Sequence, residues 1–339
     1  MRRIALINQK GGVGKTTTAA NLGAALALAG KRVVVVDLDP QANLTLYLGV
    51  ELPSGSPSSY RVLTGELAFG AALRETGTPG LRLLPTDIDL SGAELELSGA
   101  EGREKLLLAS LEAWCARERA RTGQDPADYV LFDCPPSLGL LSLNALSAAE
   151  EVFLIVQTEF LALQGVSKLV EVIELVKRRL HPGLTVTGIV PCLYDSRLRF
   201  AREVLSELRR FFGEKVFRTA IGSNVKLAES PSFGKTIFEY APESIGARDY
   251  AALAREVLAQ EPAAPALAAV PAAVVAPSEP APLPPKARPA RPKPVRAPEA
   301  VLAPQPPAAV APVPAPAAVP VEAAPAAPAA RRKPRSASS

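Results

Sequence analysis

The sequence predicts an α/β protein in which helices cover both faces of a mostly parallel, doubly wound β-sheet. Three short hydrophobic runs, residues 4–7, 33–36 and 129–132, have the composition of strands that are buried on both faces. The first run is followed by a glycine-rich turn, and the other two are followed by aspartates. Because ligands bind at the carboxyl ends of such strands, the residues after each run are candidate site residues.

The first strand leads through the glycine-rich turn into a predicted helix at residues 16–28. Glycines let backbone N–H groups approach a phosphate closely, and the helix N-terminus adds a favourable dipole. Lys15 can reach the β- and γ-phosphates, and the Thr16 hydroxyl can bind Mg²⁺. A nucleoside triphosphate is therefore the predicted ligand. The residues predicted to bind it are Lys10, Gly11, Gly12, Val13, Gly14, Lys15, Thr16 and Thr17.

Lys10 sets this turn apart from the ordinary phosphate-binding pattern. That pattern, G-x-x-x-x-G-K-[ST], needs glycine at position 9, where this chain has Gln9. The chain matches instead the variant K-G-G-x-G-K-[ST], which places a second lysine in the turn. The alternative is a chance Gly/Lys turn without a ligand, but strand, turn and helix all agree with a phosphate site.

Carboxylates follow the other two predicted strands. Asp37 and Asp39 come after the second hydrophobic run, and Asp133 comes directly after the third. Since side chains alternate along a strand, Asp37 and Asp39 can lie on one side while Leu38 faces away. Asp133 is well placed to hold Mg²⁺ through water, together with the Thr16 hydroxyl. The alternative is that these acids form turns or cap helices.

The composition changes abruptly near residue 260. The segment from Glu261 onward holds 22 of the 34 prolines and no aromatic residue. It carries nine Lys or Arg against four Glu, a net charge of +5, whereas residues 1–260 carry 29 basic and 30 acidic residues, a net charge of −1. We therefore expect a folded domain at residues 1–260 and a disordered, basic, Pro/Ala-rich tail at residues 261–339.

The cysteine pattern and the hydropathy of the chain indicate in which cellular compartment the protein is expected. The three cysteines are far apart and form no C-x-x-C pair, which favours a reducing compartment and argues against a structural zinc or an iron–sulfur site. The first residues lead straight into a strand rather than a signal peptide, and no apolar run approaches the roughly 20 residues of a membrane helix. We therefore expect a soluble, cytoplasmic protein.

Two more helices are predicted later in the chain. One spans residues 103–119, with Trp114 as a packing residue, and is followed by a loop at residues 117–128. The other spans residues 197–212 and is amphipathic. The residues expected on its buried side are Val204, Leu205, Leu208, Phe211 and Phe212. Its arginines, taken alone, are most simply a solvated face.

Four later segments strengthen the interpretation of the glycine-rich turn. They are DLDPQAN at residues 37–43, DCPPSLGLLSLNAL at 133–146, QTEFLALQG at 157–165 and NVKLAESPSFGKTI at 224–237. With the lysine-containing turn, these segments resemble the signatures of the ParA/MinD family of deviant-Walker P-loop ATPases, and of ParA/Soj-type partition ATPases in particular. The resemblance implies a P-loop NTPase fold, ATP and Mg²⁺ as cofactors, and weak, partner-stimulated ATP hydrolysis.

The resemblance also implies roles for individual residues. Lys10 would reach across an ATP-dependent homodimer to the partner's nucleotide and, with Lys15, stabilise charge during hydrolysis. Asp39 would orient or activate the attacking water. Asp133 would serve Mg²⁺, and Asp37 would support the metal site.

The segment around residue 224 bears on the base and on DNA. The resemblance places Asn224 in the adenine-side loop, although a turn-forming asparagine explains the residue almost as well. Family members bind DNA non-specifically through basic residues of this region, and the candidates here are Arg197, Arg199, Arg202 and Lys226. One departure is Gly222-Ser223, where the family commonly has Pro-Arg. The basic tail could compensate by holding DNA, it could be only a soluble spacer, or it could dock a polar scaffold or a proline-reading module.

The predicted function is ATP-dependent positioning or segregation of a chromosome, plasmid or other large cargo. The homodimer would be held on the nucleoid and released when a ParB-like activator protein stimulates hydrolysis. Membrane binding is not expected, because the proline-rich tail cannot form an amphipathic helix. One alternative is a nucleotide-dependent switch that positions a protein assembly with negligible turnover. A weaker alternative is an ATP-dependent ligase or synthetase, since no second-substrate pocket is indicated.

Overall fold

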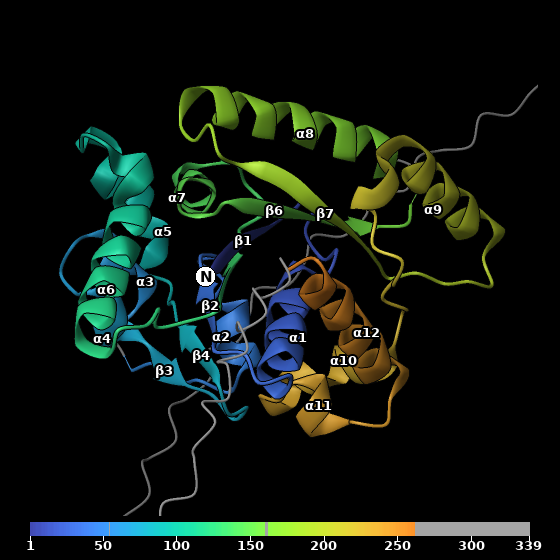
Figure 1. Cartoon of the computed structure of the whole chain (residues 1–339), viewed down its shortest axis with the longest axis horizontal. Coiled ribbons are helices and arrows are strands. Elements are labelled where there is room, and N and C mark those ends of the chain that lie inside the picture. Colours follow the sequence, from blue (N-terminus) through green and yellow to red (C-terminus); the bar gives the residue numbers. More distant parts are fainter. Residues whose placement is uncertain (54, 160–161, 262–339) are drawn as a thin grey trace, which may run out of the picture. The chain divides into compact units, whose positions relative to one another are not determined.

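The computed structural model describes residues 1–53, 55–159 and 162–261. A seven-stranded β-sheet runs through the centre of this part of the chain. The strand order is β3-β4-β2-β5-β1-β6-β7, and all neighbours pair in parallel except β3 with β4 (Figure 1). The strands are β1 (Arg2–Ile7), β2 (Val33–Asp37), β3 (Arg74–Glu75), β4 (Leu81–Leu84), β5 (Tyr129–Asp133), β6 (Glu151–Gln157) and β7 (Thr185–Cys192). The predicted mostly parallel α/β fold is confirmed.

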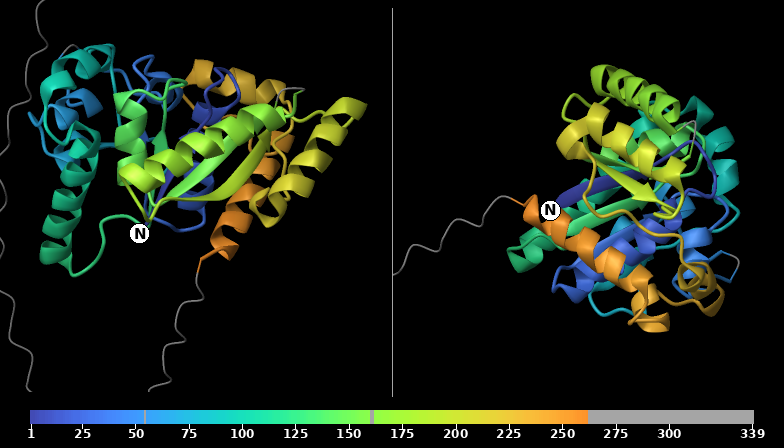
Figure 2. Two further views of the ribbon diagram at one scale, coloured as in Figure 1. Left: turned by 90° about the horizontal axis from the view of Figure 1, so that it is seen from above. Right: turned by 90° about the vertical axis from the view of Figure 1, so that its right-hand side faces the viewer.

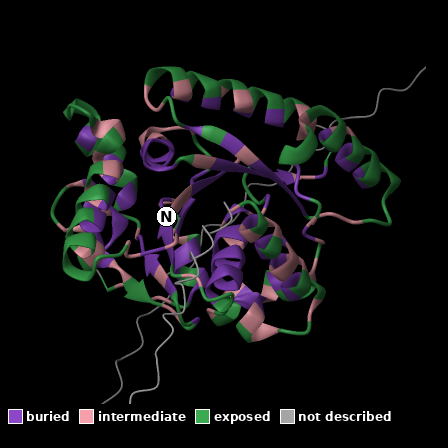
Figure 3. Ribbon diagram, viewed as in Figure 1, coloured by how far each residue is buried: buried purple, intermediate pink, exposed green. Residues whose placement is uncertain are grey.

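Alternating side chains of the strands supply two hydrophobic cores, one on each face of the sheet. In β1, Ala5 and Ile7 belong to the first core, and Ile4 and Leu6 belong to the second. The long helices of the first core are α6 (Leu106–Thr122), α7 (Leu140–Ala148), α8 (Ala162–Arg179) and α9 (Arg199–Phe212), and those of the second are α1 (Lys15–Leu28) and α12 (Ile245–Ala259) (Figures 1 and 2). Buried residues accordingly gather on the strands and on the helix sides that face them (Figure 3).

Short helices complete both layers. Near α1 lie α2 (Asn43–Tyr47) and α11 (Ile237–Tyr240), while α10 (Val225–Glu229) contacts α11. Near α6 lie α3 (Ser59–Leu63) and α4 (Phe69–Ala72), and α3 also contacts α5 (Leu90–Glu96). The 3-10 turns are η1 (Leu97–Gly99), η2 (Arg103–Lys105), η3 (Gly213–Lys215) and η4 (Ser230–Phe233). Of these short elements, α2, α10 and η4 border the site described below.

The predicted helix at residues 103–119 differs from the observed one at both ends. A 3-10 turn precedes α6, and α6 itself continues through Thr122. The prediction of a loop beginning at residue 117 is therefore wrong. The helix ends only where Gly123 takes a φ angle of 77°, which permits the left-handed turn that stops a helix. Trp114 is a packing residue as predicted, because it is buried and stacks on Phe69.

The observed helix α9 differs in two details from the amphipathic helix predicted at residues 197–212. It begins at Arg199, so that Arg197 lies in the turn before it. The expectation that Phe211 is buried is wrong, because its side chain is 65% exposed. Phe212 packs against the first core instead. Adjacent residues of a helix point about 100° apart, so only one of the two rings can face the core.

The tail prediction, residues 261–339, lies outside the described residues except for Glu261. The Glu261 carboxylate forms an ion pair with Lys31 at 2.8 Å and accepts a hydrogen bond from the Tyr129 hydroxyl. These contacts place Glu261 against the starts of β2 and β5. Within the described part of the chain, no helix is long and apolar enough to cross a bilayer.

Candidate nucleotide-binding site

The glycine-rich turn connects β1 to α1 and has the backbone of a phosphate-binding loop. Gly12 and Gly14 have φ angles of 76° and 98°, which residues with a side chain rarely adopt. Gly14 is also the N-cap of α1, so no side chain covers the first N–H groups of the helix. The Asn8 amide donates to the carbonyl oxygen of Ile155 over 2.5 Å and holds the start of the turn against β6.

A cleft of about 770 Å³ opens beside this turn. Among its lining residues are Gly11, Gly12, Gly14, Lys15, Thr16 and Thr17 of the predicted phosphate site. Asp39 and Asn224 line the same cleft, so the structure brings together residues that are distant in the sequence. Lys10 and Val13 line a neighbouring pocket instead. The cleft is large enough for a nucleotide.

Lys15 supplies a buried positive charge to the cleft. Its side chain is 6% exposed, and its ammonium donates only one long hydrogen bond, 3.4 Å to the carbonyl oxygen of Lys10. Across the described residues, Lys15 forms no ion pair with a carboxylate within 4.0 Å. A buried ammonium without a partner is costly. An anionic ligand such as a phosphate would therefore be bound favourably here.

Asp37 is buried and already fully bonded. One carboxylate oxygen accepts hydrogen bonds from the Thr45 N–H at 2.9 Å and the Thr45 hydroxyl at 2.7 Å, and the other accepts from the Asp39 N–H at 3.2 Å. Burial raises the pKa of Asp37 to about 7, against the lowering effect of the bonds from Thr45. Asp37 thus fixes the chain between β2 and α2, which fits a supporting role better than direct metal binding.

Asp133 lies beside Asp37 in the paired strands β2 and β5 and is the carboxylate without partners. Both of its oxygens are buried, and neither has a hydrogen-bond partner in the described part of the chain. Burial raises the pKa of Asp133 well above its usual range, and the neighbouring Asp37 adds to this effect. The nearby Thr16 hydroxyl and Lys15 ammonium act in the opposite direction. A divalent cation would satisfy the two free oxygens, so Asp133 and Thr16 fit a Mg²⁺ site.

Asp39 is more accessible than these two carboxylates. It is half-buried, lines the cleft, and accepts one hydrogen bond from the Gln41 N–H at 3.0 Å. Leu38 between the two aspartates is fully buried, in agreement with the expected alternation. A carboxylate in this position is available to a water molecule in the cleft, and its predicted role in orienting the attacking water stays a prediction.

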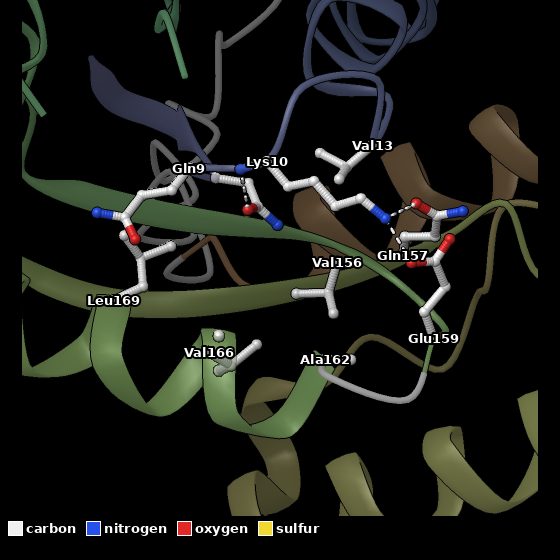
Figure 4. A pocket seen from close by; sticks show the side chains of 11 residues that line it. Gln9, Lys10, Val13, Val156, Gln157, Glu159, Ala162, Val166 and Leu169 are labelled. Carbon is white, nitrogen blue, oxygen red and sulfur yellow. Dashed lines mark hydrogen bonds and ion pairs between the residues drawn. The ribbon is translucent and has the colours of Figure 1, made fainter. Parts of the chain in front are cut away.

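Lys10 extends away from the cleft and contacts its own protomer. Its ammonium donates to the Gln157 amide oxygen at 3.1 Å and forms an ion pair with Glu159 (Figure 4). The side chains of Lys10 and Glu159 are 55% and 50% exposed. These contacts border a pocket of about 450 Å³ between the turn and the start of α8. Sequence reasoning missed Glu159, although it follows a strand as Asp37 and Asp133 do.

A buried hydrogen-bond network ties three walls of the cleft together. The Asn21 amide nitrogen on α1 donates to the Thr17 carbonyl oxygen and to the Tyr47 hydroxyl, each at 2.8 Å. The Asn21 carbonyl oxygen accepts from the Ile237 N–H at 2.7 Å. The Tyr47 hydroxyl also lies 2.8 Å from the Ser230 hydroxyl. No sequence motif indicated this network, because its members are buried polar residues without a characteristic spacing.

The backbone at Gly49 also touches the backbone at Gly234, close to the hydrogen bond between Tyr47 and Ser230. A Cβ on Gly49 would lie 2.8 Å from the carbonyl oxygen of Gly234, and a Cβ on Gly234 would lie 2.7 Å from the Cα of Gly49. Both glycines have positive φ angles, 69° and 62°. Only glycine fits at both positions. The end of α2 and the end of η4 are therefore in direct backbone contact.

Asn224 lines the cleft as the N-cap of α10. Its side-chain oxygen accepts from the Lys226 N–H at 2.8 Å, which is the turn-forming role that the sequence left open. Its predicted contact with adenine stays a prediction. Gly222 and Ser223, which depart from the family pattern, also line the cleft, and the Gly222 N–H donates to the Asp249 carboxylate at 2.9 Å.

The predicted DNA-binding residues lie outside the cleft, on and near α9 and α10. Three of the four are paired with carboxylates of the same surface. The pairs are Arg197 with Asp195, Arg199 with Glu203 and Lys226 with Glu229, at 2.7 to 2.9 Å. Arg202 donates instead to the Ser196 carbonyl oxygen at 2.5 Å. Hydrogen bonds from Arg197 lower the pKa of Asp195 to about 2, so this acid is ionised at neutral pH.

Comparison with known proteins identifies the family. Residues 1–186 match the family model described as "AAA domain". The chromosome-partitioning ATPase Soj of Thermus thermophilus is 49% identical over 260 residues, which cover 77% of this chain and 96% of that protein. The chromosome partitioning protein ParA of Caulobacter vibrioides is 44% identical over 261 residues, which cover 77% of this chain and 95% of that protein.

A solved structure with a similar fold contains an ATP analog and magnesium. Cobyrinic acid a,c-diamide synthase from Mycobacterium smegmatis, with a bound ATP analog and magnesium, superposes with a TM-score of 0.64 and 39% identity and covers 76% of this chain and 94% of that chain. The comparisons therefore agree with the family and the P-loop fold that the sequence predicted for this chain. This chain belongs to the ParA/Soj family of chromosome-partitioning ATPases.

Proposed function

We propose that ATP joins two copies of this chain into a sandwich homodimer that binds DNA non-specifically and positions or segregates a chromosome, plasmid or other large cargo. The chain is an ATPase that uses ATP and Mg²⁺. We infer the dimer from the position of Lys10. This second lysine of the phosphate loop is half-exposed and lies outside the cleft of its own protomer. Such a lysine can meet the nucleotide of a second protomer once it leaves its weak ion pair with Glu159.

The roles that we assign within the site are those that the family resemblance implies, and burial and charge support them. The buried ammonium of Lys15 binds the β- and γ-phosphates, while Thr16 and Asp133 hold Mg²⁺. Mg²⁺, when bound, neutralises charge on the phosphates. Asp39 orients the attacking water, and Lys10 of the partner stabilises the charge that develops during hydrolysis. Hydrolysis would then weaken the dimer.

DNA would be held through phosphate contacts rather than base contacts. The basic side chains of the three pairs, Arg197, Arg199 and Lys226, are exposed, and such surface ion pairs contribute little, so DNA phosphates can replace the carboxylates. Arg202 has no carboxylate partner within 4.0 Å in the described chain and is the most available cation of the four. This surface would retain the ATP-bound dimer on the nucleoid.

Release would require an activator of the ParB class that stimulates hydrolysis. The two relatives are named for chromosome partitioning, which supports a DNA cargo. The basic tail predicted at residues 261–339 would add DNA affinity. Truncation after Gln260 should therefore lower DNA retention and its salt dependence, and unchanged retention would exclude this role for the tail.

The Lys10→Ala variant tests the proposed dimer. We expect it to bind a non-hydrolysable ATP analogue with nearly unchanged affinity, measured by calorimetry, but to stay monomeric in analytical ultracentrifugation. Lys168→Ala is the matched control, since Lys168 is an exposed lysine of α8 outside the cleft. A Lys10→Ala variant that dimerises with ATP as the wild type does would remove Lys10 from this role.

Phosphate release separates this function from the alternatives. A partition ATPase should show slow basal turnover that rises when DNA and an activator are both present. A switch with negligible turnover should show no such rise. A synthetase should instead need a small co-substrate, a possibility that the name of the Mycobacterium smegmatis enzyme makes worth measuring.

A further inference from the structure

A groove along α6 contains two adjoining hollows that share no residue with the nucleotide cleft. We call the first, of about 350 Å³, the cationic hollow, and it is defined by Arg82, Trp114, Arg117, Glu118 and Arg121. The second, of about 300 Å³, is the apolar hollow, and it is defined by Val62, Leu63, Leu67, Leu106 and Ala113. Ala68 and Arg117 line both, so the two hollows are neighbours along α6.

The cationic hollow carries an uncompensated positive charge. Three arginines and one glutamate give it a net charge of +2 (3 − 1). Glu118 is engaged by Arg121 at 2.7 Å. The Arg82 guanidinium lies 5.4 Å from the centroid of the Trp114 ring and donates to the Pro126 carbonyl oxygen at 2.9 Å. In the described residues, neither Arg82 nor Arg117 has a carboxylate within 4.0 Å, although Arg82 is half-buried.

Trp114 adds an unused hydrogen-bond donor to the same hollow. Its side chain is 4% exposed, and its indole N–H has no acceptor among the residues that the structure describes. A Cβ on Gly70 would lie 2.7 Å from the Trp114 Nε1, so any larger residue at position 70 would clash with the ring edge that carries this nitrogen. An indole nitrogen and guanidinium groups can only donate. The hollow therefore suits a ligand that accepts hydrogen bonds and carries negative charge.

The apolar hollow restricts which anion fits. Leu106, Ser110, Ala113 and Arg117 recur at spacings of three and four residues, so they lie along one face of α6. From residue 106 to residue 121 this face is about 22 Å long. Its character changes from apolar to cationic along that length. Duplex DNA presents negatively charged phosphates without an adjoining apolar side chain. An acidic peptide can present negatively charged carboxylates and an apolar side chain next to each other.

We propose that this groove is a docking surface for an acidic segment of a partner protein. An apolar side chain of the segment fills the apolar hollow, and its carboxylates bind over Trp114 between Arg82 and Arg117. The proposal goes beyond the ATPase function, because none of these residues lines the nucleotide cleft.

Trp114 provides a direct readout, because it is the only tryptophan of the chain. The full-length protein is titrated with a capped synthetic peptide in which leucines precede a run of glutamates, and Trp114 fluorescence is recorded. We expect a saturable change, with binding about tenfold weaker when the glutamates are replaced by glutamines. ATP hydrolysis should be unaffected by the peptide or by the variants below.

Three variants locate the binding. Arg117→Glu reverses an exposed charge without a described partner and should weaken binding about tenfold or more. Ala113→Met fills the apolar hollow and should weaken binding while leaving the charges unchanged. Arg178→Glu on α8 is the matched control and should bind as the wild type does.

Several results would overturn the proposal. One is the absence of a saturable fluorescence change at millimolar peptide. Another is equal binding by the wild type and Arg117→Glu, or equal binding of the glutamate and glutamine peptides. A third is a fluorescence change caused by duplex DNA and abolished by Arg117→Glu, with no response to peptide, which would assign the groove to nucleic acid.

Discussion

The Lys10 ammonium forms an ion pair with Glu159 of the same protomer, at the rim of the phosphate loop (Figure 4). Both side chains are about half-exposed, so the pair contributes only about 0 to 1 kcal/mol. The proposed dimer needs Lys10 to leave this position and reach the partner's nucleotide. The Lys10–Glu159 pair therefore opposes dimerisation weakly, and ATP in two protomers can overcome it.

Removing the Glu159 charge should strengthen the ATP-dependent dimer. We expect Glu159→Gln to lower the dimer dissociation constant by up to about thirtyfold, because about 1 kcal/mol of competing interaction is lost in each of the two protomers. Sedimentation with a non-hydrolysable ATP analogue measures this constant. Glu171→Gln, an exposed position of α8, serves as the control. A weaker dimer in Glu159→Gln would show that Glu159 supports the dimer instead.

The buried Asp37 should make stability depend on pH. Its pKa is about 7 in the folded chain and about 3.9 in the unfolded chain, so the folded state keeps its proton over a range in which the unfolded state loses it. The contribution is fully present below about pH 4 and is lost as the pH rises through about 7. Asp37→Asn lacks this titration and should gain stability relative to the wild type across that range, on the order of 1.4 kcal/mol per pH unit.

Urea unfolding of both proteins at pH 5 and pH 7.5, without nucleotide or Mg²⁺, measures the difference. The comparison between the two proteins removes the contribution of the other carboxylates. A difference that is the same at both pH values would mean that Asp37 titrates normally in the folded chain.

Replacing Asp133 should separate metal binding from stability. Asp133→Asn removes a buried carboxylate without hydrogen bonds, so the nucleotide-free protein should be at least as stable as the wild type. The gain in nucleotide affinity on adding Mg²⁺ should fall by about tenfold or more. Calorimetry with and without EDTA measures that gain. If Asp133→Asn kept the full Mg²⁺ effect, the metal would have to be held elsewhere.

The basic surface near α9 should show the salt dependence of phosphate contacts. Arg202→Ala should weaken DNA binding equally for unrelated sequences and lower the slope of log K against log salt by about 0.9. Glu203→Gln should strengthen binding, because it releases Arg199 from its ion pair. Fluorescence anisotropy over a salt series measures both effects, with Arg178→Ala as the control. A sequence-dependent loss in Arg202→Ala would indicate base contacts.

Local chemistry explains which parts of the fold and site were predictable. The phosphate loop and the three aspartates follow from short patterns, since a glycine-rich turn or an acid after a buried strand lies at the carboxyl edge of the sheet wherever that strand is placed. The three predicted strands lie within β1, β2 and β5, because a short run of hydrophobic residues is typical of a strand that is buried on both faces. The end of α6 was wrong because polar residues 117–122 are as compatible with an exposed helix as with a loop.

Long-range pairing explains what was missed. Glu159 meets Lys10 only because β6 lies beside β1, and this neighbour relationship is not encoded in either segment alone. Asn21, Tyr47 and Ser230 come from three separate elements, and each would be unremarkable as a single polar residue. The exposure of Phe211 depends on how much of α9 the first core covers, which hydrophobic periodicity does not determine.

Asn21 connects Thr17 of the phosphate loop to α2 through the Tyr47 hydroxyl and to α11 through the Ile237 N–H. These segments also touch directly where Gly49 meets Gly234. We therefore expect these segments and the phosphate loop to keep their spacing when a ligand enters, so that the cleft is largely preformed.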